Sequence, residues 1–130
     1  MRDVVVRFED NYPHNVLAFL EERIRKNGSD LNIKMLEDIV PKELVSMVFS
    51  QHLARSIGIE HIGDPHAVVW AAGPFEDDWF KRLHEEGYRG KRVLVHTAIP
   101  SAYNLKDYAT HVLAVPKRGF VDELYGILNS

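Results

Sequence analysis

The chain has 130 residues, which is enough for about one domain with a sizeable core. Hydrophobic residues make up 45% of it and charged residues 27%, which is the balance of a globular domain. The formal net charge of −3 gives no electrostatic reason to bind nucleic acid or an anionic membrane, so we expect neither as a partner.

The sequence also lacks a long apolar run, a signal-peptide pattern and cysteine, and each absence argues against a class of protein or site. No apolar run approaches the roughly 20 residues that a membrane-spanning helix needs. Met1-Arg2-Asp3-Val4 enters a strand pattern at once, so we expect no signal peptide. The sequence has no cysteine, which excludes disulfides, thiolate catalysis and zinc–sulfur sites. We therefore predict a cytoplasmic protein.

The amino-terminal quarter predicts a strand followed by a helix. Val4-Val5-Val6 is a β-branched run, which is typical of a buried strand. The helix is expected to run to about Lys26, with Asn15 or Asn11 as its cap and Asn27-Gly28 as its stop. Its apolar stripe at helical spacing consists of Val16, Leu17, Leu20 and Ile24.

A second strand and helix follow. Leu31–Leu36 alternates apolar and polar residues, which indicates a half-exposed strand. Pro41 suits a first helical position, and we expect one helix from there to about Ser56, ended by Gly58. Its buried face would consist of Leu44, Val45, Val48, Phe49 and Leu53. Residues 59–62 fit either a short extra strand or an irregular connector.

The second half of the chain repeats this alternation. Ala67–Ala72 is almost continuously apolar, as a central parallel strand covered on both faces should be. A helix is expected from Pro74 to Gly87, with Phe75, Trp79, Phe80 and Leu83 inward. The remaining predicted elements are a strand at Arg92–His96, a turn at Leu105–Tyr108, a strand at Val112–Val115 and a helix at Phe120–Leu128. The inward residues of that last helix would be Phe120, Val121, Leu124, Ile127 and Leu128.

Strands and helices thus alternate through short connections over the whole chain. We predict a single α/β domain over residues 1–130, with a three-layer flavodoxin-like (Rossmann-like) fold and a mostly parallel sheet of about five strands. A fragment of a larger two-domain Rossmann enzyme is the alternative. Ligands gather at the carboxyl ends of such strands, and there the central strand offers only Ala71-Ala72-Gly73.

The best-known phosphate loops are missing from these strand ends. There is no G-x-G-x-x-G after the first strand and no G-x-x-x-x-G-K-[ST] anywhere. Glu9 and Asp10 after the first strand would repel a pyrophosphate. We therefore expect no dinucleotide site of the usual kind.

Lys117-Arg118-Gly119 is the one strand-end loop with positive charge beside a helix start, which would favour a bound anion.

Four potential metal ligands fall within seven residues: Glu60, His61, Asp64 and His66. Their spacing matches no established metal motif, and His66 lies at the amino end of its strand. We therefore predict no metal site.

A histidine and a serine near the end of the fourth strand raise the question of a hydrolase. His96, Thr97 and Ser101 lie at or beyond the carboxyl end of that strand, which is the correct edge. However, G-x-S-x-G is absent, and adjacent strand residues face opposite ways. We therefore name no catalytic residue. The two tryptophans, Trp70 and Trp79, fit the core better than a stacking platform.

Val4-Val-Val-Arg-Phe-Glu-Asp-Asn11, followed by a helix, resembles the opening of receiver domains of bacterial response regulators. The acidic pair that holds Mg²⁺ in that family matches Glu9 and Asp10. The Thr-Ala pair after its fourth strand matches Thr97-Ala98, and the proline after its fifth strand matches Pro116.

The reactive positions depart from this family. The phosphorylated aspartate falls on Ala71, or on Ala72 if the alignment slips by one, and the lysine that would contact the phosphoryl group falls on Val115. The segment between Asp10 and Ala71 is also longer, so we expect an extra element there. The resemblance implies a degenerate (pseudo-)receiver, a signalling or regulatory module without the phospho-acceptor aspartate that acts by protein–protein contact.

The alternative is a small-molecule or nucleotide-binding Rossmann-like enzyme with its site at the strand carboxyl ends. The candidate ligand-binding residues are Glu9, Asp10, Gly73, Thr97, Ser101, Lys117 and Arg118. The sequence indicates no particular cofactor. We expect a protein partner, and a homo-oligomer stays open.

Overall fold

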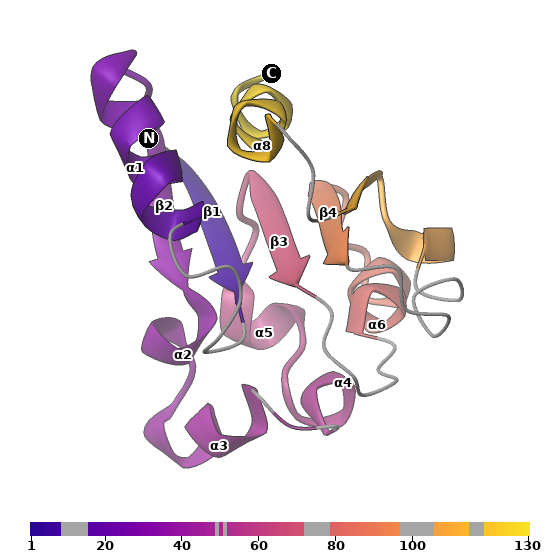
Figure 1. Ribbon diagram of the computed structural model, residues 1–130. Helices are drawn as coiled ribbons and strands as arrows, with labels where there is room; N and C mark the ends of the chain where they lie inside the picture. Colours follow the sequence, from indigo (N-terminus) through magenta and orange to yellow (C-terminus); the bar gives the residue numbers. More distant parts are fainter. Residues whose placement is uncertain (9–15, 49, 51, 72–78, 97–105, 115–118) are drawn as a thin grey trace.

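The three valines near the amino terminus belong to β1, Arg2–Arg7, inside a five-stranded sheet (Figure 1). The computed structural model describes residues 1–8, 16–48, 50, 52–71, 79–96, 106–114 and 119–130. The other strands are β2 Leu31–Met35, β3 Ala67–Ala71, β4 Lys91–His96 and β5 His111–Ala114. All pairings are parallel and the strand order is β2-β1-β3-β4-β5, which confirms the predicted sheet.

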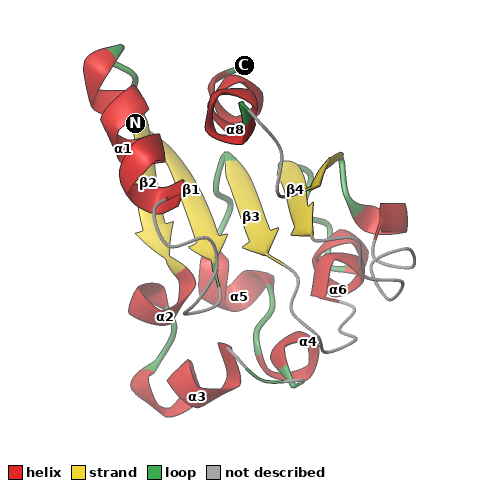
Figure 2. Cartoon of the chain, in the orientation of Figure 1, coloured by secondary structure: helices red, strands yellow, loops and turns green. Residues whose placement is uncertain are grey.

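Helices cover both faces of this sheet (Figure 2). On one face, here called the α1/α8 face, α1 (Val16–Lys26) lies beside α8 (Phe120–Asn129). The opposite face, the α5/α6 face, carries α5 (Ile59–Ile62) and α6 (Trp79–Glu85). The remaining helical pieces are α2 Leu36–Ile39, η1 Lys42–Leu44, α3 Val45–Val48, α4 Leu53–Ser56 and η2 Lys106–Tyr108.

Strand alternation divides the core into two apolar clusters. Val4 and Val6 of β1 belong to the cluster on the α1/α8 face, whereas Val5 belongs to the cluster on the α5/α6 face. All five residues of β3 are buried, because helices cover the strand on both sides. The prediction of a central strand at this position is confirmed.

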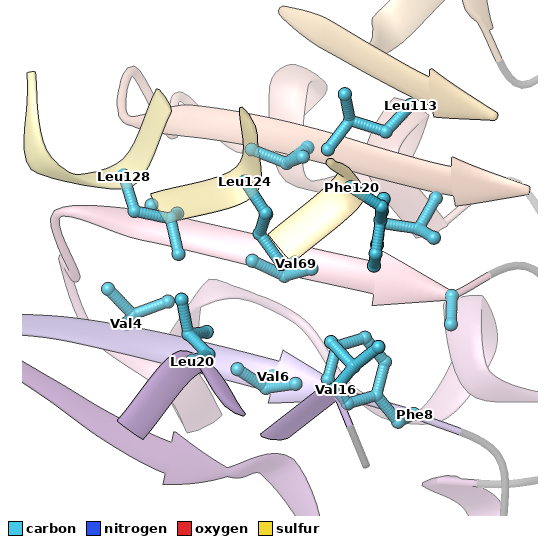
Figure 3. Packing of buried hydrophobic residues seen from close by; sticks show 14 of the residues in the cluster. Val4, Val6, Phe8, Val16, Leu20, Val69, Leu113, Phe120, Leu124 and Leu128 are labelled. Carbon is cyan, nitrogen blue, oxygen red and sulfur yellow. The ribbon is translucent and has the colours of Figure 1, made fainter. Parts of the chain in front are cut away.

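The α1/α8 face is closed by the predicted apolar stripes of two helices. Leu20 of α1 and Leu124 of α8 are fully buried, and Figure 3 shows them lying over Val4, Val6 and Val69 of the sheet. Burying one leucine side chain contributes about 2 kcal/mol. The predicted stop of α1 is also confirmed, because the chain turns at Gly28 with a φ of 62°.

The single helix predicted from Pro41 to Ser56 is wrong, because the chain breaks it into η1, α3 and α4. The break lies at Ser50, whose hydroxyl donates to the Met47 carbonyl oxygen and accepts from the His52 N–H. Serine side chains that bond to nearby backbone in this way compete with helix formation. Among the residues predicted for its buried face, Val48 and Leu53 are fully buried. Leu44 and Val45 are partly buried, and Phe49 lies outside the described residues.

Residues 59–62, expected as a strand or an irregular connector, form the helical turn α5 instead. Gly58 precedes this turn, and its N–H donates to Nδ1 of His61 over 3.1 Å. Gly63 ends the turn with a φ of 72°, a conformation that favours glycine. The signals that start and stop α5 are therefore two glycines and one histidine ring.

Several predicted features fall partly or wholly outside the described residues. These include the caps Asn11 and Asn15 and the helix start at Pro74. Within the described ranges α6 begins at Trp79, and Gly87 follows it with a φ of 95°. In the same ranges, no helix is both long and apolar enough to span a bilayer.

Candidate functional site

The carboxyl ends of all five strands meet at one edge of the sheet, because every pairing is parallel. The sequence order of the strands reverses between β1 and β3. Open α/β sheets bind ligands in the crevice outside this reversal. The described residues that end the two strands are Arg7 and Ala71, and α3 lies beyond the arrowheads of the sheet (Figure 1).

Arg7 is a buried cation at this edge, with 3% of its surface exposed. Its Nε donates to the Val48 carbonyl oxygen over 2.8 Å, and its Nη1 donates to the Ala71 carbonyl oxygen over 3.1 Å. One guanidinium therefore ties together the ends of β1, α3 and β3. A guanidinium stays charged in proteins, so this edge carries a permanent positive charge.

Sequence reasoning missed Arg7, although a signal for it exists. The residue follows three valines in a strand buried on both faces, where a basic side chain needs a specific partner. Its partners, however, lie 41 and 64 residues further along the chain. No local pattern identifies them.

An aromatic cluster adjoins Arg7 on the α5/α6 face. Trp70 pairs with Arg7 across the β1–β3 ladder and packs edge-on against Trp79, with ring centroids 6.2 Å apart and planes at 88°. The Trp79 indole N–H donates to the Ile57 carbonyl oxygen over 2.9 Å. The Trp70 indole N–H is buried without a hydrogen-bond partner, as far as the described chain extends. The prediction that both tryptophans belong to the core is confirmed.

All seven predicted ligand-binding residues lie outside the described residues: Glu9, Asp10, Gly73, Thr97, Ser101, Lys117 and Arg118. Their roles stay predictions. Gly119, the described member of the predicted basic loop, precedes α8 with a φ of 78°. His96 ends β4, as expected.

The two histidines among the four potential metal ligands between residues 60 and 66 bond to different backbone groups. His66 Nε2 lies 2.8 Å from the Leu128 carbonyl oxygen at the end of α8. His61 instead accepts the Gly58 N–H through Nδ1. In the described ranges, no group of three or more histidine, aspartate or glutamate side chains is placed to hold a metal ion.

His66 belongs to a set of basic residues at the carboxyl end of α8, on the opposite edge of the sheet. Lys91 Nζ donates to the Ile127 carbonyl oxygen over 2.7 Å, and Arg2 Nη1 donates to the Asn129 carbonyl oxygen over 3.0 Å. Burial, and then the nearby charge of Arg2, lower the pKa of Lys91. Cationic donors suit the carbonyl groups that a helix leaves unpaired at this end. This edge therefore fastens α8.

No protein-family model matches the chain, and no curated protein matches it. Among solved structures, the chain is similar to the solution structure of two-electron reduced flavodoxin from Megasphaera elsdenii. The TM-score is 0.53 at 12% sequence identity, and the match covers 99% of this chain and 98% of the flavodoxin. At this identity the likeness shows the fold alone. The chain has a three-layer α/β flavodoxin-like fold with five parallel strands.

Proposed function

We propose that this protein is a receiver-like regulatory module that accepts no phosphoryl group and acts by contact with a partner protein. The observation that carries the proposal is the end of β3. There the side chain is the methyl group of Ala71, which is 2% exposed. A methyl group has no lone pair with which to attack phosphorus, so this position cannot form an acyl phosphate.

The position of Arg7 also argues against phosphorylation at the end of β3. Phosphoryl transfer at a receiver-like edge would require a divalent cation near the acceptor. The guanidinium whose Nη1 lies 3.1 Å from the Ala71 carbonyl oxygen places a buried cationic donor beside that position instead. The resemblance assigns Mg²⁺ to Glu9 and Asp10, and two carboxylates hold this ion weakly without further oxygen ligands.

The test is incubation of the purified protein with acetyl phosphate and Mg²⁺, followed by intact-mass measurement. We expect no mass gain, while an active receiver domain treated in parallel gains one phosphoryl group. Stoichiometric phosphorylation would contradict the proposal, whether the modification is stable to acid or is removed by hydroxylamine.

A second candidate is a small-molecule or nucleotide-binding enzyme at the same edge. It is favoured by the reversal of strand order between β1 and β3, where such folds bind ligands. A thermal-shift screen with nucleotides, FMN, phosphosugars and divalent metals distinguishes the two. A ligand at 100 times its Kd stabilises a protein by about 2.7 kcal/mol, so a true ligand gives a clear shift.

The proposal also includes a cytoplasmic location, which the cysteine-free composition permits. Assembly into a homo-oligomer is compatible with contact-based regulation. Sedimentation equilibrium over a range of concentrations tests it directly.

A further inference from the structure

A groove of about 480 Å³ opens on the α5/α6 face, between the β1–β2 pair and α5. Its size falls in the range of specific binding pockets. Its polar lining residues are Asp3, Lys34, Glu60, His61 and Asp64. Neither Arg7 nor Ala71 lines it, so the groove is separate from the carboxyl-edge site described above.

The groove combines an apolar floor with charged walls. Its apolar lining consists of Val5, Ile39, Ile62 and Pro65. Val5 and Ile62 are almost fully buried, at 2% and 8% exposure, whereas Glu60 is 70% exposed at its side chain. The accessible carbon surface of the floor therefore comes mainly from the half-buried Ile39, and the acids stand where water reaches them.

The residues that line this groove carry more negative than positive charge, because its one lysine is paired with one of its three acids. Asp3 accepts hydrogen bonds from Nδ2 of Asn32 over 3.1 Å and from Nζ of Lys34 over 3.2 Å. These two donors, Asn32 first, lower the pKa of Asp3. The charge of Lys34 is therefore already paired with Asp3.

Glu60 and Asp64 keep their negative charges available. The nearest ionisable partner of Glu60 is His61, whose Nε2 lies 3.8 Å from the carboxylate. Nδ1 of that ring accepts the Gly58 N–H. Asp64 makes no salt bridge and no side-chain hydrogen bond to the described part of the chain. The groove consequently carries an excess of negative charge.

We propose that this groove receives a lysine or arginine side chain from an extended segment of a partner protein. The inference rests on the proposed function, since it names the chemistry of the partner. Lysine and arginine carry an apolar stem and a cationic head. The stem matches the apolar lining, whose accessible part is the half-buried Ile39, and the head matches Glu60 and Asp64.

A protein segment fits better than a free amine because of the neighbouring strand. β2, which contributes Lys34 to the groove, lies at the edge of the sheet and pairs with β1. The outer edge of such a strand offers backbone donors and acceptors to an added extended segment. A segment bound there would bring every second side chain toward the groove.

The experiment is an NMR titration of the isotope-labelled full chain with a short blocked peptide that carries two lysines. We expect amide shifts centred on Lys34 and on residues 60–64, which weaken at high salt. The same peptide with norleucine in place of lysine should bind at least about fivefold more weakly, as the loss of two exposed ion pairs predicts.

Two protein variants test the residues. Glu60→Gln together with Asp64→Asn should weaken binding of the lysine peptide by about fivefold. Glu85→Gln removes a negative charge from the exposed end of α6, outside the groove, and should leave binding almost unchanged. Unchanged spectra of the free variants confirm that they fold.

Four results would overturn the inference. The norleucine peptide could bind as tightly as the lysine peptide, or the double variant could behave like Glu85→Gln. Equal binding of free 1,5-diaminopentane would identify a small-amine site in place of a docking groove. Peptide-induced amide shifts confined to other surfaces would refute binding in the groove, but they would not contradict the proposal that the protein acts by contact with a partner protein. Phosphorylation by acetyl phosphate would refute the proposed function without any change in the titration.

Discussion

The two faces of the sheet are covered by different means. On the α1/α8 face, two helices of 11 and 10 residues lie on a continuous apolar cluster. On the α5/α6 face, most of the segment between β2 and β3 consists of pieces of three or four residues. Helices this short gain little from their own hydrogen bonds. The second face therefore needs another kind of support.

That support comes from side chains that donate to backbone carbonyl groups of the short pieces. Arg7 donates to Val48 at the end of α3, and Trp79 donates to Ile57 just after α4. Arg82 of α6 donates to the Ala54 carbonyl oxygen over 2.6 Å. The carbonyl groups at helix ends lack partners within the helix, so they are available for such bonds. The comparison teaches that side chains donate to helix carbonyl groups on both faces, at the carboxyl end of α8 and along the short pieces. The two faces differ in helix length, since the short pieces have no long apolar stripe and bury single residues such as Val48 and Leu53.

The largest expected effect tests the apolar face. Leu124→Ala should lower the free energy of unfolding by about 3 kcal/mol, because it leaves a cavity beneath α8 in a fully buried position. Urea denaturation measures the loss. Val112→Ala, at a side chain 39% exposed on β5, is the control and should cost much less. Equal losses in the two variants would show that α8 is not held by its apolar stripe.

The next effect tests the polar anchors. Arg7→Met keeps an apolar stem but removes the donors to Val48 and Ala71, and it should cost about 2 kcal/mol. Arg25→Met, on the exposed side of α1, should change stability by less than about 0.5 kcal/mol. If both arginine variants are equally stable in urea, the guanidinium does not fasten α3.

A matched tryptophan pair sharpens the comparison further. Trp79→Phe and Trp70→Phe each remove part of a buried indole, but only Trp79 donates a hydrogen bond, within the described chain. Trp79→Phe should therefore be the more destabilising by about 1 kcal/mol. Thermal or urea unfolding of both variants gives the difference. The opposite order would mean that the bond to Ile57 contributes nothing.

The smallest effect is a pH dependence at the groove. Hydrogen bonds from Asn32 and Lys34 hold the pKa of Asp3 below its ordinary value of 3.8 in the folded protein. The folded state therefore binds fewer protons than the unfolded chain, and this contribution is present above pH 3.8. It is lost as the pH falls through the lower pKa of the folded state. Asp3→Asn should thus be less stable than the natural protein at neutral pH.

Unfolding curves from about pH 6 to about pH 2.5 check this expectation. The stability difference between the natural protein and Asp3→Asn should shrink toward acid pH. Lys34→Met removes one of the two causes and should show the same convergence. A difference that stays constant over the whole range would contradict the role assigned to Asp3.

Much of the fold could be predicted because its signals are local. The β-branched run at Val4–Val6, the apolar stretch of β3 and the stripe of α8 each identify their element from neighbouring residues. The helix predicted from Pro41 failed for an equally physical reason. Apolar residues continue at helical spacing through Ser50, while one hydroxyl bonded to local backbone interrupts the helix.

The candidate site was harder to predict, since its parts are distant in sequence. Arg7 acquires its role from carbonyl groups that no spacing rule connects to it. Similarly, the groove exists because residues 60–65, far along the chain from β1 and β2, line it together with residues of these strands. The residues predicted at the strand carboxyl ends stay predictions, because they lie outside the described ranges.

The position of the two tryptophans has a spectroscopic consequence. Both indoles of the sequence lie in one cluster on the α5/α6 face, with their ring planes at 88° to each other. Tryptophan fluorescence excited selectively over tyrosine therefore reports on that layer and reports little on the leucines beneath α1 and α8. Far-ultraviolet circular dichroism reports on both layers. If the anchored pieces separate from the sheet before α8 does, the fluorescence transition will precede the far-ultraviolet one, and the domain will not unfold as a single unit.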